Sequence, residues 1–250
     1  MAAGMDELLA DLTAEYDRLE AMLAPLRASQ WAAPSGAAGW SIADVVLHLA
    51  LTEEAVVRSA AGGSGLAGED GDAAGGAGLE DSMAAAVAAA GADGPAAFAR
   101  WQAARRASVA ALAGADPDRP LPWAAAPLKP RTLATTRLAE HWAHALDVAA
   151  GIGAEVADTS RLRHVVWLGH ATLPYAFGLA GLEPVAVRVE LTGPDGDTWQ
   201  YGPAGAATTV TGPAGQFCRV GARRLRPEAT DLVAAGPGAA DVLHLLRNWA

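Results

Sequence analysis

The chain has 250 residues, of which 52% are hydrophobic, and it carries a formal net charge of −10. Its length suits two domains of roughly 100–150 residues, and its negative charge argues against nucleic acid or an anionic membrane as a partner. It contains no apolar run of about 18 residues, so no transmembrane helix is expected. The first residues lack the basic start and apolar run of a signal peptide, and we expect a cytoplasmic protein.

Cysteine and lysine each occur once in the chain. Cys218 is the only cysteine, so no intrachain disulfide can form. It lacks the partner of a CxxC motif, and we expect a small buried side chain rather than a nucleophile. Lys129 is the only lysine, and the preference for arginine, with abundant alanine and glycine, indicates a GC-rich coding sequence.

The first two predicted helices are joined by a loop. Leucines at steps of three and four predict an amphipathic helix over residues 5–27. Residues 29–39 are expected to form the loop, with Trp31 anchored against a helical bundle. The next helix begins after Ser41, an N-cap whose capping box is completed by Asp44.

This second helix continues to about Ala60 and carries His48 beside its apolar stripe. His48 is the only ionisable residue between Asp44 and Glu53. One interpretation is a core histidine bound to a backbone carbonyl. The other is a ligand of a metal ion whose remaining ligands lie elsewhere in the chain.

A low-complexity stretch separates the second helix from the third. Alanine and glycine predominate over residues 61–78, which predicts a flexible loop. Residues 81–90 are compatible with a weak alanine-rich helix. Residues 95–113 are predicted as the third strong helix, and the proline-rich residues 116–130 as an extended connector that crosses the bundle.

The fourth helix is predicted over residues 131–151, with Pro130 before its start and Gly151 as its stop. Apolar and polar residues form two separate stripes along it. The apolar stripe comprises Leu138, Trp142, Ala145 and Ala149, and the polar stripe comprises Arg137, Glu140, His144 and Asp147.

Glu140 and His144 stand one turn apart, so both side chains can reach one divalent cation. The alternative is an exposed pair that stabilises the helix by about 0.2–0.5 kcal/mol. His141 follows Glu140 directly, but its side chain points roughly 100° away around the helix. Asp147 is either a hydrogen-bond partner of these ligands or a surface acid.

After about residue 155 the pattern predicts a second, smaller domain. A helix begins at Thr159 or Ser160 and ends near Leu179, and alternation over residues 185–191 predicts a strand. The Asp-Gly pair within residues 193–196 is typical of a hairpin turn. The remaining elements are strands over residues 198–201, 207–211 and 231–234, and helices over residues 213–224 and 239–249. The predicted fold is a four-helix bundle over residues 1–155, mainly α, followed by a small α+β domain over residues 156–250.

Two motifs of the predicted bundle resemble one known family. They are Gly-Trp-Ser-Ile-Ala-Asp-Val-Val-Leu-His-Leu-Ala, which contains His48, and Arg-Leu-Ala-Glu-His-Trp-Ala-His-Ala-Leu-Asp-Val-Ala, which contains Glu140 and His144. Together they are similar to the mycothiol-dependent maleylpyruvate isomerase family of DinB-like four-helix metalloproteins. The resemblance spans nearly the whole chain. Val-Arg-Val-Glu-Leu-Thr-Gly-Pro-Asp-Gly and Val-Thr-Gly-Pro-Ala-Gly-Gln-Phe-Cys resemble the C-terminal domain of that family, which is similar to sterol-carrier folds.

The resemblance implies a set of site residues. His48, Glu140 and His144 match the positions of the family's metal ligands, and the metal is usually zinc. Arg223 best matches an arginine that holds the carboxylates of the substrate, and Arg224 matches nearly as well. The alternative for either arginine is a side chain that complements the dipole of its helix. The family also implies mycothiol as a thiol cosubstrate, which is made by actinobacteria.

The implied activity is that of a metal- and thiol-dependent isomerase or S-transferase. Its substrate would be a small electrophilic metabolite, unsaturated and carboxylated, attacked by a metal-activated thiolate. One alternative is a thiol-independent metalloenzyme, such as a cyclase or hydrolase of a biosynthetic pathway. Another is a non-catalytic protein that binds a small molecule. We expect a monomer or a weak homodimer.

Overall fold

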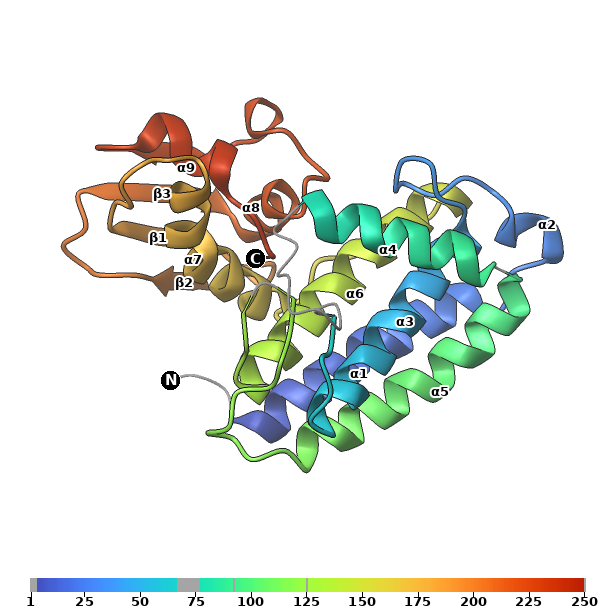
Figure 1. Cartoon of the computed structure of the whole chain (residues 1–250). Helices are drawn as coiled ribbons and strands as arrows, with labels where there is room; N and C mark the ends of the chain where they lie inside the picture. The colour runs from blue at the N-terminus through green and yellow to red at the C-terminus, as the bar shows by residue number, and fades with distance from the viewer. Residues whose placement is uncertain (1–3, 67–76, 92, 125, 250) are drawn as a thin grey trace. The chain divides into compact units, whose positions relative to one another are not determined.

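The computed structural model describes residues 4–66, 77–91, 93–124 and 126–249. Contacts divide the chain into two compact units, Met1–Val156 and Ala157–Ala250. The first unit is helical and the second combines helices with a four-stranded sheet, which confirms the predicted fold class (Figure 1). In the described part of the chain, no helix is both long and apolar enough to cross a membrane.

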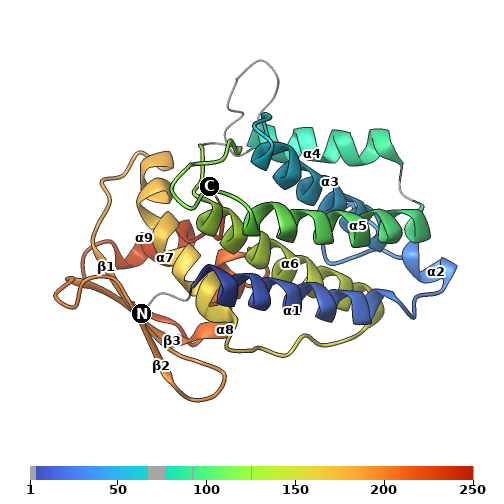
Figure 2. The ribbon, with the colours of Figure 1, turned by 90° about the horizontal axis from the view of Figure 1, so that it is seen from below.

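Four long helices lie side by side in the first unit (Figures 1 and 2). They are α1 (Met5–Leu23), α3 (Ile42–Ala60), α5 (Gly94–Ala113) and α6 (Pro130–Ile152). α3 packs most extensively on α5, and α1 packs on α6. The apolar stripe predicted for α6 is buried along its length, and each large side chain there contributes about 1.5–3 kcal/mol by leaving water.

The start of α3 is fixed by the predicted capping box. Ser41 Oγ accepts a hydrogen bond from the backbone N–H of Asp44 at 3.2 Å. The carboxylate of Asp44 accepts in return from the backbone N–H of Ser41 at 2.9 Å. Because both donors belong to the first turn, the box sets the direction in which α3 leaves the preceding loop, and so the placement of His48.

The segment between α1 and α3 is more regular than the sequence predicted. α1 ends at Leu23 rather than near residue 27, and a short helix, α2 (Ala28–Trp31), follows. The side chain of Gln30 accepts from the backbone N–H of Arg27 at 3.1 Å, a local cap that the sequence analysis missed. Trp31 is buried and packs on Phe98 of α5, with ring centroids 5.7 Å apart, as expected of an anchor.

The stretch between α3 and α5 was predicted as a flexible loop over residues 61–78. Its central part, residues 67–76, lies outside the described residues. α4 (Ala77–Ala90) begins four residues earlier than the predicted weak helix. At the described start of the stretch, residues 61–64 are exposed, whereas Gly65 is buried and a Cβ placed on it would meet the backbone oxygen of Pro122 at 2.5 Å. The mobility of the loop stays a prediction.

α6 ends at Ile152, and the glycine that stops it lies two residues beyond the predicted stop, Gly151. Gly153 is the C-cap of α6, and its φ of +68° lies in the left-handed region that favours glycine. Gly151 lies inside the helix for a different reason. A Cβ there would meet the backbone oxygen of Pro34 at 2.7 Å, so the glycine permits the loop before α3 to approach α6 closely.

The second unit is built on a sheet with the strand order β2-β1-β3-β4. The strands are β1 (Val187–Thr192), β2 (Thr198–Tyr201), β3 (Thr208–Pro213) and β4 (Val233–Ala235). β1 pairs antiparallel with β2 through the predicted turn at Gly196, and parallel with β3 in the register Val187 to Thr208. Alternate residues of β1 are buried, as the sequence alternation predicted.

Three helices contact this sheet: α7 (Leu162–Leu179), α8 (Ala214–Gly221) and α9 (Ala239–Leu245). A 3-10 turn, η1 (Pro227–Ala229), lies between α8 and β4. Cys218 of α8 is fully buried, and burial raises the pKa of its thiol well above the usual value. The side chain is therefore a core residue, as expected, and α8 and α9 are shorter than the predicted helices.

Candidate metal centre

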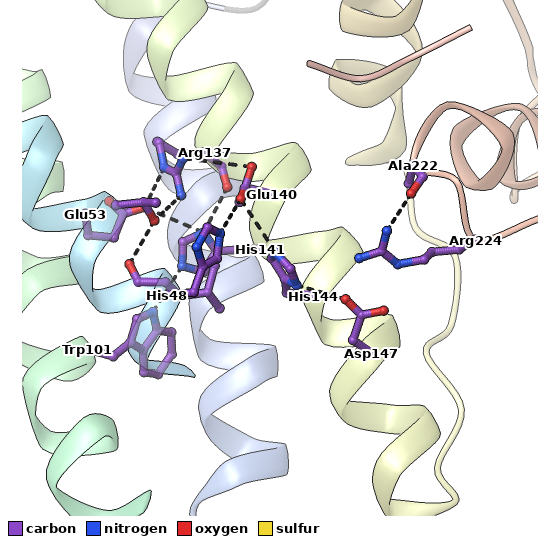
Figure 3. Close-up of polar contacts among 12 residues, drawn as sticks. His48, Glu53, Trp101, Arg137, Glu140, His141, His144, Asp147, Ala222 and Arg224 are labelled. Atoms are coloured by element: carbon purple, nitrogen blue, oxygen red, sulfur yellow. Dashed lines mark hydrogen bonds and ion pairs between the residues drawn. The ribbon is translucent and has the colours of Figure 1, made fainter. Parts of the chain in front are cut away.

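Three side chains from α3 and α6 converge at one point in the bundle (Figure 3). Oε1 of Glu140 lies 2.8 Å from Nε2 of His48 and 3.5 Å from Nε2 of His144. One potential ligand atom from each residue lies within 4.8 Å of the other two. Glu140 and His144 come from successive turns of α6 and His48 from the middle of α3, so helix packing assembles the cluster.

The cluster is sheltered without being sealed. The side chains of His48 and His144 are 9% and 12% exposed, whereas Glu140 keeps 29% of its side-chain surface accessible. The cluster is therefore in contact with solvent through the side chain of Glu140.

The donor set and its spacing suit a divalent transition metal. Two imidazoles and one carboxylate are a common set of three protein ligands for catalytic zinc, in which the fourth position stays open. Bonds of about 2.0–2.1 Å at tetrahedral angles place ligand atoms roughly 3.3 Å apart. The distances from Glu140 to the two imidazoles, 2.8 and 3.5 Å, bracket that separation.

Asp147 orients one of the imidazoles. Its Oδ2 accepts a hydrogen bond from Nδ1 of His144 at 2.8 Å, and its side chain is 2% exposed. The backbone N–H of Gly36 donates to the carbonyl of Asp147 at 2.9 Å and closes the loop before α3 over this turn of α6. Asp147 is therefore not a surface acid. With the proton on Nδ1, the lone pair of Nε2 in His144 faces the cluster.

Trp40 packs against both imidazoles. Its ring centroid lies 5.1 Å from that of His48 and 6.4 Å from that of His144, and it is stacked on the second with an interplanar angle of 16°. Trp40 immediately precedes Ser41, the N-cap residue of α3. Packing against the indole limits the rotation of both imidazoles.

Burial and hydrogen bonding set the charges in the cluster. Burial lowers the pKa of His48, which favours the neutral imidazole that a metal requires. Burial alone would raise the pKa of Glu140, but hydrogen bonds from His144 and His48 and the charge of Arg137 lower that pKa well below its usual range. Burial would lower the pKa of His144, but bonds to Asp147 and Glu140 outweigh it and raise the pKa.

A buried ion pair lies directly beside the cluster (Figure 3). Nε of Arg137 donates to Oε1 of Glu53 at 2.8 Å, and Nη2 donates to Oγ1 of Thr52 at 2.7 Å. The side chains of Arg137 and Glu53 are 3% and 0% exposed. Nη1 of Arg137 lies 4.0 Å from Oε2 of Glu140, the oxygen that does not face the imidazoles.

His141 belongs to the core and not to the cluster. Its Nδ1 donates to the backbone oxygen of Arg137 at 2.9 Å, and its Nε2 accepts from Nε1 of Trp101 at 3.0 Å. Burial lowers the pKa of His141 to about 4, so the ring is neutral at pH 7. Its direction away from Glu140 agrees with the helix geometry expected from the sequence.

Trp40, Thr52 and Glu53 were not predicted from the sequence as neighbours of the cluster. Thr52 and Glu53 follow His48 by one turn of α3, and Arg137 precedes Glu140 by one turn of α6. This one-turn spacing from His48 and Glu140 was the only sequence signal that these residues lie near the cluster. It did not reveal which faces of α3 and α6 meet.

Arg223 and Arg224 follow α8 in the second unit, and both are exposed. Arg223 has φ +60°, and its Nη1 donates to the backbone oxygen of His244 at 2.9 Å. Arg224 donates from Nη1 to the backbone oxygen of Ala222 at 2.7 Å (Figure 3). A role for either in holding the carboxylates of a substrate stays a prediction.

Fold and site together define a class of protein: a four-helix bundle with two histidines and one glutamate converging between two helices, joined to a small α+β domain. A model of the mycothiol maleylpyruvate isomerase N-terminal domain matches residues 12–149. The chain therefore belongs to the mycothiol maleylpyruvate isomerase family.

Similar proteins are known along nearly the whole chain. Proteins from two strains of Mycobacterium tuberculosis, both named as uncharacterized, are 38% identical over 246 residues, which cover 97% of this chain and 95% of theirs. A crystal structure of the mycothiol-dependent maleylpyruvate isomerase superimposes with a TM-score of 0.63 at 13% identity, covering 93% of each chain. A histidine-to-alanine mutant of that enzyme gives a TM-score of 0.61. At this identity the two crystal structures establish a shared fold.

Proposed function

We propose that the protein is a metal-dependent enzyme that uses mycothiol to isomerise a small unsaturated metabolite, or, as an S-transferase, to join mycothiol to it through a C–S bond. The observation that carries this proposal is the cluster of His48, Glu140 and His144 in a member of the mycothiol maleylpyruvate isomerase family. A divalent metal such as zinc, with mycothiol bound beside it, would supply a thiolate at neutral pH, the nucleophile that both reactions need.

The residues of the chain have separate tasks in this proposal. His48, Glu140 and His144 hold the metal, and Asp147 keeps His144 in the tautomer whose Nε2 is a ligand. Trp40 packs against the imidazoles and limits their rotation. The partly exposed side of Glu140 is where the thiol and the substrate would approach.

We further propose that Arg223 binds a carboxylate of the substrate. A guanidinium presents five N–H donors in a planar fork that matches a carboxylate. The bond from Nη1 to the backbone oxygen of His244 holds the side chain in place, and Arg223 is exposed in the second unit. Arg224 is the second candidate, and Arg226, also exposed, is a matched control.

The test is turnover of maleylpyruvate by zinc-loaded protein, with and without mycothiol. Proton NMR detects the trans isomer as it forms. We expect turnover only with both metal and thiol, and a raised KM in Arg223→Gln but not in Arg226→Gln. Turnover without any thiol would point instead to a cyclase or hydrolase. If the purified protein holds no metal and turns over neither maleylpyruvate nor other unsaturated acids, it would be a binding protein.

A further inference from the structure

The ion pair beside the cluster is placed to act on one atom of the candidate ligand set. Oε1 of Glu140 faces both imidazoles, at 2.8 and 3.5 Å from their Nε2 atoms. Oε2 of the same carboxylate faces Nη1 of Arg137 at 4.0 Å. The two oxygens thus lie in different surroundings, one toward the ligands and one toward a fixed positive charge.

The guanidinium of Arg137 is itself held from three sides. Nε donates to Glu53 and Nη2 donates to Thr52, so two of the three guanidinium nitrogens are bonded to residues of α3. The ring of Trp123, from the connector before α6, lies 5.8 Å from the guanidinium carbon. The third nitrogen, Nη1, is therefore directed toward Glu140 by contacts that do not involve the cluster.

A buried ion pair is not needed merely to join two helices. Apolar residues of similar volume often give equal or better stability, because taking two charges out of water is costly. Arg137 and Glu140 lie one turn apart on α6, which brings the two side chains near each other, and the bonds to Glu53 and Thr52 leave Nη1 as the nitrogen that faces the outer oxygen of Glu140. The placement favours a role toward the cluster.

We propose that Arg137 is a positioning residue, whose positive charge attracts the outer oxygen of Glu140 so that the carboxylate offers a metal only its inner oxygen. Glu53 and Thr52 fix Arg137 and are the supports of this arrangement. The inference rests on the proposed metal site and adds a residue that sets its coordination. It concerns metal geometry and affinity, and it applies whatever the substrate.

The consequence concerns the coordination number. A carboxylate held at one oxygen provides one bond, which leaves a further position for an incoming thiol. Without Arg137, the carboxylate of Glu140 is free to turn and to bind through both oxygens. The coordination number of the metal would then rise. Its affinity would fall, because the contact with Arg137 that orients the carboxylate is lost.

The test is cobalt binding to the full chain, which reports affinity and geometry without turnover. Cobalt(II) absorbs visible light more strongly in a four-coordinate site than in sites with more ligands. The main variant is the double substitution Arg137→Gln and Glu53→Gln, which removes both charges of the buried ion pair together. We expect about 10–100-fold weaker binding and a lower absorption for each cobalt bound.

Two further variants keep the result interpretable. Arg105→Gln is the control, because Arg105 is also a buried arginine paired with carboxylates, those of Asp17 and Glu20 of α1, which are partly exposed. The Arg105→Gln variant should bind cobalt as the wild type does. Arg137→Lys retains the charge for Glu53 but lacks the planar fork. We expect it to fold like the wild type, as judged by circular dichroism, and to show weaker binding and altered absorption.

The outcomes separate this inference from the proposed function. Wild-type affinity and absorption in either the double variant or Arg137→Lys would overturn the role of Arg137 and leave the metal site intact. A wild-type protein that binds no cobalt would overturn the proposed function, and the positioning role with it.

Discussion

Asp147 accepts a hydrogen bond from Nδ1 of His144 at 2.8 Å, and water is almost absent around its carboxylate, which is 2% exposed. A shielded carboxylate aimed at one imidazole fixes the orientation of that ring and increases the electron density on its other nitrogen. Such a pair is ordinary behind a metal-ligating histidine. It has no obvious purpose on a solvated helix face, so the bond connects the fold directly to the proposed chemistry.

Replacing Asp147 with asparagine should weaken metal binding while the bundle stays folded. Asparagine retains the size and one acceptor, but it lacks the negative charge that makes His144 a better ligand. We expect about a tenfold to hundredfold loss of zinc affinity, measured by competition with a chromophoric chelator. Asp17→Asn, on the outer part of α1 beside Arg105, is the control and should leave the affinity unchanged.

Replacing His144 with alanine should remove the metal and also lower stability. The lost imidazole leaves the buried carboxylate of Asp147 with one partner fewer, at a cost of about 1–3 kcal/mol. The gain in helix propensity from alanine is smaller. Thermal melting of the apo proteins measures the loss. The double variant His144→Ala with Asp147→Asn should recover part of it, and equal melting temperatures for the single and double variants would speak against the role of the charge.

His141→Ala should destabilise the bundle without acting on the metal site directly. The substitution leaves Nε1 of Trp101 and the backbone oxygen of Arg137 without the imidazole that binds both, and it opens a cavity. The expected cost is on the order of 3 kcal/mol. Chemical denaturation compares it with His244→Ala, whose side chain is 59% exposed. Unchanged unfolding of His141→Ala would be inconsistent with its place in the core.

The thiol of Cys218 should resist alkylation in the folded protein. The residue is fully buried, and burial raises its pKa well above the usual value, so little thiolate exists at pH 8. Iodoacetamide should modify it slowly in buffer and rapidly in guanidinium chloride, as followed by mass spectrometry. Rapid labelling of the native protein would show that the thiol is accessible, and that a cysteine of the chain itself is available as a nucleophile.

Much of the fold follows from local signals in the sequence. The capping box at Ser41, the prolines of the connector and the alternation along β1 each act within a few residues. The capping box lies where it was predicted, whereas Pro130 is the first residue of α6 instead of the residue before it, and β1 begins at Val187 instead of residue 185. The end of α6 was misplaced because two nearby glycines have different roles. Gly151 allows close approach of Pro34, a contact distant in sequence, whereas Gly153 provides the left-handed cap.

The surroundings of the cluster were harder to predict, because they depend on which helix faces meet. Arg137 and Asp147 lie on a polar stripe, a pattern that usually faces water, yet both are buried. Their burial depends on partners contributed by α3 and by the loop before it, namely Glu53 and Gly36. Periodicity along one helix contains no information about those partners.

The most direct test of the account is the metal content of freshly purified protein, prepared without chelators or a polyhistidine tag. Elemental analysis should find about one zinc-like ion per chain in the wild type and little in Glu140→Gln, which keeps the size of the side chain but loses its charge. Glu54→Gln is the control, because Glu54 pairs with Arg100 on the outside of the bundle, and it should retain the metal. A wild type without transition metal, or a Glu140→Gln variant with as much metal as the wild type, would contradict the assignment of His48, Glu140 and His144 as the metal centre.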